Sequence, residues 1–328
     1  MIKVIKSKFR VKDLFKRLND KVDIFICCGS YESRCRTLAD QLDPEDIQSA
    51  IIAENVNLEN YVGENTSYLN SRFREKGFTA KLNSNQPLVT ADALALSLKK
   101  VGGRTKKRYL IDITTFTHES LLILIKLLRL NLKRNDEVFF AYTSAAEYSI
   151  MNNDKDKWLS KGLLDIRSVL GYPGEISPSL PMHLIVLVGY EYERAARLIE
   201  VLEPRFISLG YGRAGTSTES KHQSANEHFH RLTKNVAGIY GNVMDFTFSC
   251  SDPIDSMKSL NKAARRVNKC NLYVAPMNTK ISTLGTALAA MANNKMRLCY
   301  AQPMRYNYIN YSIPGDYCYL FEVKSFKE

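Results

Sequence analysis

The segment IFICCGSYESRCRTLADQLDP at Ile24–Pro44 recurs without a gap as LIVLVGYEYERAARLIEVLEP at Leu184–Pro204, 160 residues further along the chain. In each copy a continuous apolar run ends at a glycine, Gly29 or Gly189. Such a run is typical of a strand buried on both faces of a parallel sheet. Leucines spaced four residues apart follow, and the closing proline ends the helix that they predict. The segment therefore predicts a strand, a turn and a helix, twice.

Two further pairs of segments follow in the same order and at nearly the same spacing. LIDITTFTHESLLILIKLL from Leu110 resembles LYVAPMNTKISTLGTALAAM from Leu272, and FAYTSAAEY from Phe140 resembles LCYAQPMRY from Leu298. Apolar strands that alternate with helical patterns imply right-handed βαβ units and a parallel sheet with helices on both faces. We therefore expect an α/β fold of two tandem Rossmann-like domains with mainly parallel sheets, related by internal duplication.

Each repeat is expected to close with an edge strand of its own. Leu163–Val169 is the candidate strand in the first repeat, and Tyr317–Val323 is its counterpart in the second. The expected domains are a basic amphipathic N-terminal segment at 1–22, a first Rossmann-like repeat at 23–170, a Pro- and Gly-rich linker at 171–181, and a second Rossmann-like repeat at 182–328.

The chain is basic, with 46 Lys and Arg against 34 Asp and Glu and a net charge of +12. A basic balance favours anionic partners. In the opening segment the apolar positions Val11, Leu14, Phe15 and Leu18 fit one face of a helix, whose lysine face is then exposed to solvent. A second basic cluster, GGRTKKR at Gly102–Arg108, is expected to be an exposed loop, and neither basic patch interleaves with aromatic residues as single-strand binding platforms do. The nucleic-acid-binding candidates are Lys6, Lys8, Arg10, Arg104, Lys106 and Lys107.

Several classes of protein are not favoured by the composition. The seven cysteines are odd in number and form no CxxC, so a zinc ribbon and a secreted disulfide framework are not indicated, and a reducing cytoplasm fits. The basic opening lacks the apolar core of a signal peptide, and no apolar run reaches the roughly 20 residues of a membrane helix. His228 and His230 stand two apart, which points them to different helix faces, so no metal is expected.

A ligand site is expected at the carboxyl ends of the strands, where ligands bind in open parallel sheets. Glycine lets a backbone approach the ligand, tyrosine offers a stacking face, arginine can fork onto phosphate, and hydroxyls at a helix start can bind an anion. The predicted ligand-binding residues are Gly29, Ser30, Tyr31, Arg34, Thr115, Thr117 and His118 in the first repeat and Gly189, Tyr190, Arg194, Asn278, Thr279 and Lys280 in the second.

Structural roles are an alternative for the same residues. The glycines can be simple turn residues, each arginine can pair with a neighbouring carboxylate, and Thr117 and Thr279 can be helix N-caps. Neither turn contains GxGxxG or a Walker sequence, so a dinucleotide cofactor and P-loop hydrolysis have no direct support.

The segments DITTFTHES and APMNTKISTLGTALAA, set in a duplicated Rossmann-like chain, resemble the CARF domains of CRISPR-associated sensors and the related SAVED domains. The resemblance implies a sensor of prokaryotic antiviral defence that binds a nucleotide or a cyclic oligonucleotide. It places that ligand near Gly29, Ser30, Thr115, Thr117 and His118 and near Gly189, Tyr190, Thr279 and Lys280. No fused nuclease or HEPN-type signature is visible, so the effector would be a separate protein chain.

Two other functions stay open beside the sensor. In the first, a nucleotide-directed enzyme, a nucleoside hydrolase or transferase or a ring nuclease, uses Glu32, Glu191 or His118 as catalytic candidates, with Asp112 as a further proton carrier. In the second, the chain is a basic nucleic-acid-binding or scaffold subunit of a larger complex. The sequence leaves the oligomeric state open.

Overall fold

The computed structural model describes residues 3–18, 22–103, 105–149, 158–309, 311–324 and 326. The chain divides into two compact units. The first consists of Met1–Glu147 together with Ser312–Glu328, and the second is Tyr148–Tyr311. Each unit has its own sheet and its own apolar core.

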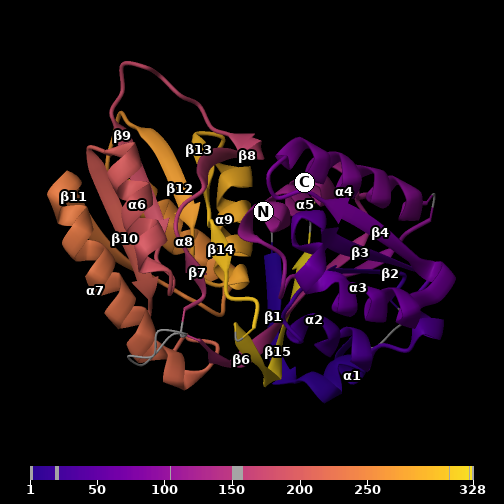
Figure 1. The fold of residues 1–328 in the computed structure, drawn as a ribbon. Coiled ribbons are helices and arrows are strands. Elements are labelled where there is room, and N and C mark those ends of the chain that lie inside the picture. The colour runs from indigo at the N-terminus through magenta and orange to yellow at the C-terminus, as the bar shows by residue number, and fades with distance from the viewer. Residues whose placement is uncertain are drawn as a thin grey trace. The chain divides into compact units, whose positions relative to one another are not determined.

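The sheet of the first unit has the spatial order β1, β15, β6, β5, β2, β3, β4 (Figure 1). Strands β2 to β6 run parallel. Their order is that of a doubly wound Rossmann sheet, in which the chain adds strands first on one side of β2 and then, from β5 on, on the other side. The strands are β1 Lys3–Arg10, β2 Ile24–Gly29, β3 Ser49–Asn55, β4 Gly77–Leu82, β5 Arg108–Asp112, β6 Glu137–Tyr148 and β15 Ser312–Lys324, and the helices are α1 Leu14–Leu18, α2 Arg34–Thr37, α3 Glu59–Phe73, α4 Pro87–Val101 and α5 His118–Asn131.

The sheet of the second unit has the spatial order β11, β10, β9, β12, β13, β8. Strands β9 to β13 run parallel, and β8 is antiparallel to β13. Two short strands, β7 and β14, form a separate antiparallel ladder. The strands are β7 Ser160–Lys161, β8 Asp165–Pro173, β9 Met182–Leu187, β10 Phe206–Gly212, β11 Asn242–Phe248, β12 Asn271–Pro276, β13 Met296–Gln302 and β14 Arg305–Tyr306, and the helices are α6 Tyr192–Leu202, α7 Gln223–Tyr240, α8 Pro253–Ala264 and α9 Lys280–Ala292.

The two units repeat one another element by element. Strands β2 to β6 with helices α2 to α5 correspond to strands β9 to β13 with helices α6 to α9, and the corresponding strands take the same places in the two sheets. The predicted fold, two Rossmann-like α/β domains with mainly parallel sheets, is confirmed. The central strands are buried as the apolar runs indicated, since all six residues of β2 are buried.

The last strand of each repeat lies in the unit that the sequence did not indicate. β8 follows β6 in the chain but pairs with β13 of the second unit, and β15 follows β13 but lies between β1 and β6 of the first unit. The units therefore differ from the predicted domains at residues 148–181 and 312–328. An apolar pattern identifies a strand, but it does not say which sheet edge the strand joins.

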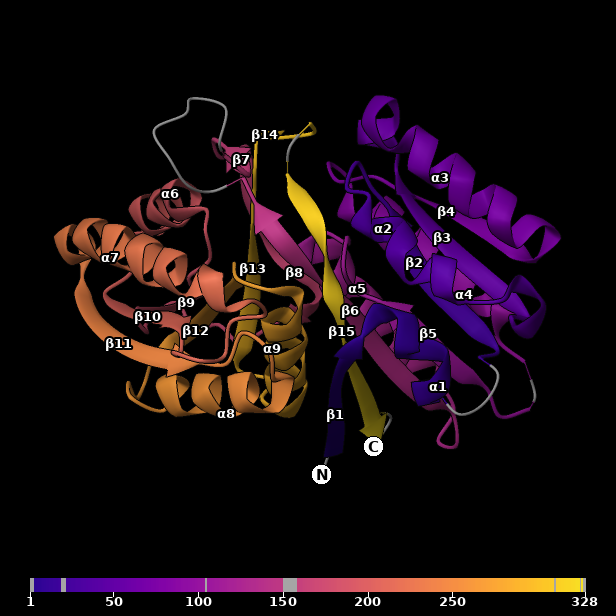
Figure 2. The same ribbon diagram turned by 90° about the horizontal axis from the view of Figure 1, so that it is seen from below.

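The N-terminal segment also differs from the prediction of one amphipathic helix. Its residues Lys3–Arg10 form β1, which pairs antiparallel with β15 along its whole length, and only a short 3-10 turn and α1 follow (Figure 2). Val11, Leu14 and Leu18 are buried as predicted, whereas Phe15 is exposed. The edge of β15 offers unpaired backbone groups to this segment, and strand pairing satisfies them.

The basic candidates have partners that the sequence did not indicate. The ammonium of Lys8 lies 4.4 Å from the ring centroid of Tyr317 and 5.2 Å from that of Tyr319, and Lys6 lies 5.9 Å from Tyr319. The aromatic neighbours that the opening segment lacks in its own sequence pattern are thus supplied by β15. Arg10 is exposed on β1. Lys106 pairs with Glu137, Lys107 donates to Gln48, and Arg104 lies outside the described residues.

Candidate functional site

The carboxyl edge of the first sheet carries a buried ion pair. Both Nη2 and Nε of Arg34 donate to Oε2 of Glu32, at 2.6 and 3.0 Å, and Nη1 donates to the carbonyl of Thr143 at 3.2 Å. The two side chains are only 3% and 7% exposed. Ser312, at the start of β15, donates its hydroxyl to the same carboxylate oxygen. The carboxylate of Glu32 is therefore engaged by Arg34 and Ser312. This is the structural role considered above, in which each arginine pairs with a neighbouring carboxylate, and it does not leave Glu32 as a free nucleophile.

The second unit repeats this arrangement. Arg194 pairs with Glu191, and their side chains are 5% and 9% exposed. Ser160, on β7, donates its hydroxyl to the other oxygen of Glu191. In both units the glutamate of the first turn thus accepts a hydrogen bond from a serine. Ser312 begins β15, and Ser160 lies shortly before β8, the two strands that join the sheet of the other repeat. The sequence showed the glutamate and the arginine but had no pattern that indicated the serine.

The turn glycines make room for neighbouring protein atoms. A Cβ at Gly29 would overlap the hydroxyl of Thr66 on α3, and a Cβ at Gly189 would overlap the carbonyl oxygen of Met277. In both places packing of the chain against itself explains the glycine. A ligand that approaches the backbone is not needed to explain it.

Replacing Gly189 with alanine is expected to destabilise the second unit. Because the overlapping atom belongs to the backbone of Met277, it cannot move aside as a side-chain end can, and overpacking of this kind costs about 1–3 kcal/mol. Thermal unfolding of Gly189→Ala measures the effect. Gly238→Ala is the matched control, because Gly238 lies on α7 with no atom within 4 Å of an added Cβ. Equal melting temperatures for the two variants would contradict the packing role.

The hydroxyls of the later turns are used by the backbone. Thr117 is the N-cap of α5 and accepts from the amide of Ser120 at 3.1 Å, and Thr279 caps α9 in the same way at 3.2 Å. The hydroxyl of Thr115 donates to the carbonyl of Cys28 at 2.7 Å. Both predicted N-caps are therefore present, and these hydroxyls are engaged before any ligand arrives.

The remaining predicted residues lie at the same two edges in varied surroundings. Asn278 donates to the carbonyl of Val188 at 2.6 Å and accepts from the amide of Thr279. Ser30 accepts from the amide of Glu32 at 3.2 Å. His118 is buried at the start of α5, while Tyr31 and Lys280 are half-buried.

Asp112 is a buried carboxyl at the end of β5. It is 1% exposed, and its Oδ1 accepts from the amide of Thr114 at 3.0 Å and from the Thr114 hydroxyl. Its Oδ2 is buried and has no hydrogen-bond partner among the described residues. Burial raises the pKa of Asp112 to about 7, against the opposing effects of Thr114 and of the charge on Arg34. This acid is therefore neutral over much of the acidic range.

The carboxyl edge of the second sheet contains a small open cavity. Its volume is about 150 Å³. It lies at the turn between β9 and α6, which holds Tyr190, one of the predicted ligand-binding residues. Segments distant in the sequence complete the wall, and they include Trp158, the only tryptophan of the chain. The lining residues are Ser149, Trp158, Leu159, Ser160, Lys161, Tyr190, Glu191, Tyr192, Glu193 and Phe229.

Three of the four aromatic residues of this cavity are linked by ring contacts, with Phe229 between Tyr190 and Tyr192. The rings of Tyr192 and Phe229 stack at 6.0 Å with an interplanar angle of 17°, and Tyr190 lies 6.0 Å from Phe229 and 5.5 Å from Tyr148. Burial and the neighbouring carboxylate of Glu193 raise the pKa of Tyr192, so its hydroxyl stays protonated. Sequence reasoning found Tyr190 but missed Trp158 and Phe229, because neither belongs to the repeated turn.

Other reactive side chains contribute little at either edge. All seven cysteines are free, and burial raises the pKa of Cys35, Cys250 and Cys299 to about 12, so they are poor nucleophiles. Over the described part of the chain, no group of three or more His, Cys, Asp or Glu is placed to hold a metal. None of the helices in that part is long and apolar enough to cross a membrane.

The sequence matches no protein-family model and no curated protein. Among solved structures, an S-adenosylmethionine-dependent methyltransferase from Clostridium acetobutylicum is similar over 44% of this chain and 54% of its own, at 14% identity and a TM-score of 0.26. A second, from Leishmania major, is similar over 51% and 67%, at 11% identity and 0.27. Geranyl diphosphate C-methyltransferase from Streptomyces coelicolor is similar over 95% and 76%, at 7% identity and 0.26. This chain thus spans about half the length of the Clostridium protein. Such distant likenesses assign no activity to it.

The predicted function, an antiviral nucleotide sensor, is contradicted by these neighbours, which are methyltransferases. The cavity is consistent with the correction. At about 150 Å³ it is smaller than the roughly 300 Å³ at which pockets for drug-sized ligands begin, so a cyclic oligonucleotide would not fit inside it. The resemblance to CARF and SAVED domains, the separate partner chain and the cytoplasmic location stay predictions.

Proposed function

We propose that this protein is a small-molecule binding protein whose second unit holds a compact organic cation, of the quaternary ammonium type, at the carboxyl edge of its sheet. The observation that carries the proposal is the cavity walled by Trp158, Tyr190, Tyr192 and Phe229. Aromatic ring faces attract cations, and cages of such rings are a common way to recognise quaternary ammonium groups.

A cation already lies against this wall. The ammonium of Lys161 is 4.8 Å from the ring centroid of Trp158, which is within the range of a cation–π contact. Among the described residues Lys161 has no carboxylate partner. The aromatic face of Trp158 therefore already attracts a positive charge, and a ligand cation would compete with Lys161 for it.

The carboxylates of the cavity favour the same sign of ligand charge. Glu191 is neutralised by Arg194, but Glu193 is exposed and has no cationic partner in the described chain. A cation in the cavity would place its charge near the carboxylate of Glu193. The size of the cavity limits the ligand to a headgroup of few atoms.

Intrinsic fluorescence tests the proposal directly, because Trp158 is the only tryptophan in the chain. Choline is the probe, and we expect a saturable change in tryptophan emission. Its neutral isostere 3,3-dimethylbutan-1-ol, which replaces the charged nitrogen with carbon, should bind about twofold to thirtyfold more weakly, because a cation–π contact contributes about 0.5–2 kcal/mol. Equal binding of the two compounds, or no saturable change, would overturn the proposal.

Variants identify the groups responsible. Tyr190→Leu and Glu193→Gln should each weaken choline binding several-fold, whereas Lys161→Met should strengthen it by removing the competing ammonium. Glu200→Gln is the control for Glu193→Gln, because Glu200 lies on the same helix, α6, outside the cavity lining. If Lys161→Met abolished binding, Lys161 would be a ligand-binding group and not a competitor.

A further inference from the structure

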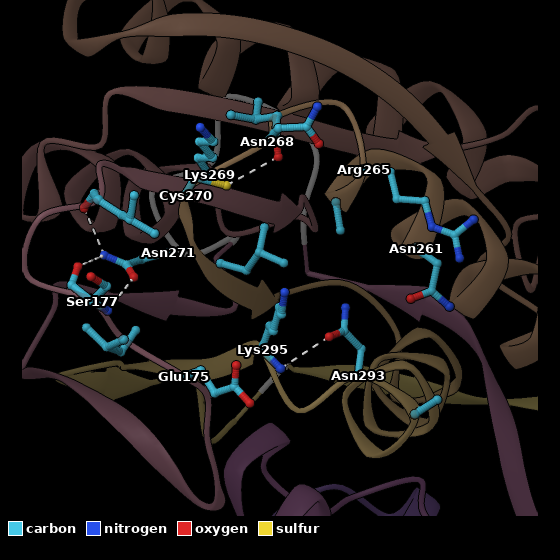
Figure 3. A pocket seen from close by; sticks show the side chains of 16 residues that line it. Glu175, Ser177, Asn261, Arg265, Asn268, Lys269, Cys270, Asn271, Asn293 and Lys295 are labelled. Atoms are coloured by element: carbon cyan, nitrogen blue, oxygen red, sulfur yellow. Dashed lines mark hydrogen bonds between the residues drawn. The ribbon is translucent and has the colours of Figure 1, made fainter.

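A second cavity lies at the opposite edge of the second sheet. It has a volume of about 620 Å³ and is bounded by the C-terminal ends of α8 and α9 and the starts of β12 and β13. Figure 3 shows Lys295 extending toward the middle of this cavity, with Glu175 and Asn293 beside it. Arg265 and Lys269 line two other sides of the cavity, and Figure 3 shows their charged ends turned away from Lys295 in this view.

The charges of this cavity are unbalanced. Arg265, Lys269 and Lys295 line it against a single carboxylate, that of Glu175, which already accepts a hydrogen bond from Asn294. In the described part of the chain none of the three cations forms an ion pair. Two positive charges are therefore left over in a concave site.

Uncharged groups in the lining suit the same kind of ligand. The side-chain amides of Asn261 and Asn268 have no hydrogen-bond partner within the described residues, so both can donate to an incoming oxygen. Ile176, Leu180 and Leu272 add apolar wall between the polar groups. Lys269 has a φ of +52°, a backbone conformation that favours glycine, yet the position carries a lysine that lines the cavity.

We infer that this cavity is a second binding site, for a small organic anion that carries at least two negative charges. The cations would neutralise the charges of the anion, the free amides would donate to its oxygens, and the apolar wall would pack against its carbon skeleton. The site lies away from the sheet edge proposed above for the cation, and it does not depend on that proposal.

A structural role for the same cations predicts a different result. Positive side chains near helix C-termini interact favourably with the helix dipole, and Arg265 directly follows α8. In that role the cations stabilise the empty protein, and their removal lowers the melting temperature without changing any response to anions. The experiment must therefore measure binding as well as stability.

Pyrophosphate and citrate are the probes, because they carry the same class of charge on phosphate or carboxylate groups. At matched ionic strength and at about ten times the dissociation constant, we expect the better probe to raise the melting temperature by about 3 °C. Lys295→Gln and Arg265→Gln should each weaken its binding, measured by calorimetry, about fivefold. Lys258→Gln is the control, since Lys258 is exposed on α8 and lies outside the lining of the cavity. This variant should bind the probe as tightly as the natural protein does.

Three outcomes would overturn the inference. In the first, neither probe binds the natural protein. In the second, both probes bind, but Lys258→Gln weakens their binding as much as Lys295→Gln does. In the third, Lys295→Gln and Arg265→Gln lower the melting temperature and leave probe binding unchanged. The relative strength of pyrophosphate and citrate shows which anionic group the site prefers.

Discussion

A chain that ends at Tyr311 will lose the folded structure of its first unit, although the missing residues belong to the second repeat by sequence order. The truncation removes β15, which contributes Cys318, Tyr319, Leu320, Phe321 and Val323 as buried side chains. Burial of such side chains contributes about 1.5–3 kcal/mol each, on the order of 10 kcal/mol for the five. That loss is comparable to the whole stability of a typical domain.

The truncation also leaves backbone and polar groups without partners. β1 pairs with β15 in eight successive positions, so its ladder disappears with the strand. Glu32 loses the hydroxyl of Ser312 but stays beside Arg34 in a buried place. The damage is therefore expected across the sheet of the first unit and is not confined to its edge.

Amide hydrogen exchange distinguishes the two units. We expect protection to be lost at β2 and β3 and kept at β9 and β12, while the emission of Trp158 in the second unit changes little. A synthetic peptide of residues 312–328, added to the truncated chain, should restore protection at β2. Loss of protection at β9 and β12 instead would show that β15 stabilises the repeat that precedes it in the chain.

Asp112→Asn will remove a large part of the pH dependence of stability. The pKa of Asp112 is about 7 in the folded protein, against an ordinary value of 3.8. Between these values the unfolded chain has released the proton and the folded chain still holds it, so stability falls as the pH rises. At about 1.4 kcal/mol per pKa unit, the loss between pH 4 and pH 7 amounts to about 4 kcal/mol.

Urea unfolding at pH 5 and pH 8 measures this effect. The natural protein should lose about 3 kcal/mol more than Asp112→Asn over that interval, because asparagine has no proton to release. Asp92→Asn serves as the control, since Asp92 is exposed on α4 and should leave the profile of the natural protein unchanged. Parallel profiles for the natural protein and Asp112→Asn would show that Asp112 is ionised in the folded state at both pH values.

Part of the site was visible in the sequence and part was not. The repeat located the turn that holds Tyr190 and Glu191, and the spacing of a threonine before a helix predicted the caps at Thr117 and Thr279. Trp158 and Phe229 stand 32 residues before and 39 residues after Tyr190, and no pattern links them to that turn. Their place in the cavity follows from how β7 and α7 fold onto the end of β9.

The same contrast holds for the glycines and for the basic patch. The sequence indicated that Gly29 and Gly189 end strands, but whether a ligand or a neighbouring atom lies beside them depends on Thr66 and Met277. Likewise the lysines of β1 gain aromatic neighbours only because β15 lies next to them.

Local patterns were therefore enough for the strands, the helices, their caps and the duplicated order of the two halves, because these depend on residues within a few positions of one another or on a buried apolar run. The destination of β8 and β15 depended on tertiary structure. A strand joins a sheet through backbone N–H and C=O groups, which are the same in nearly every residue. The amino-acid sequence of β15 therefore indicates that it is a strand but not which strand it pairs with.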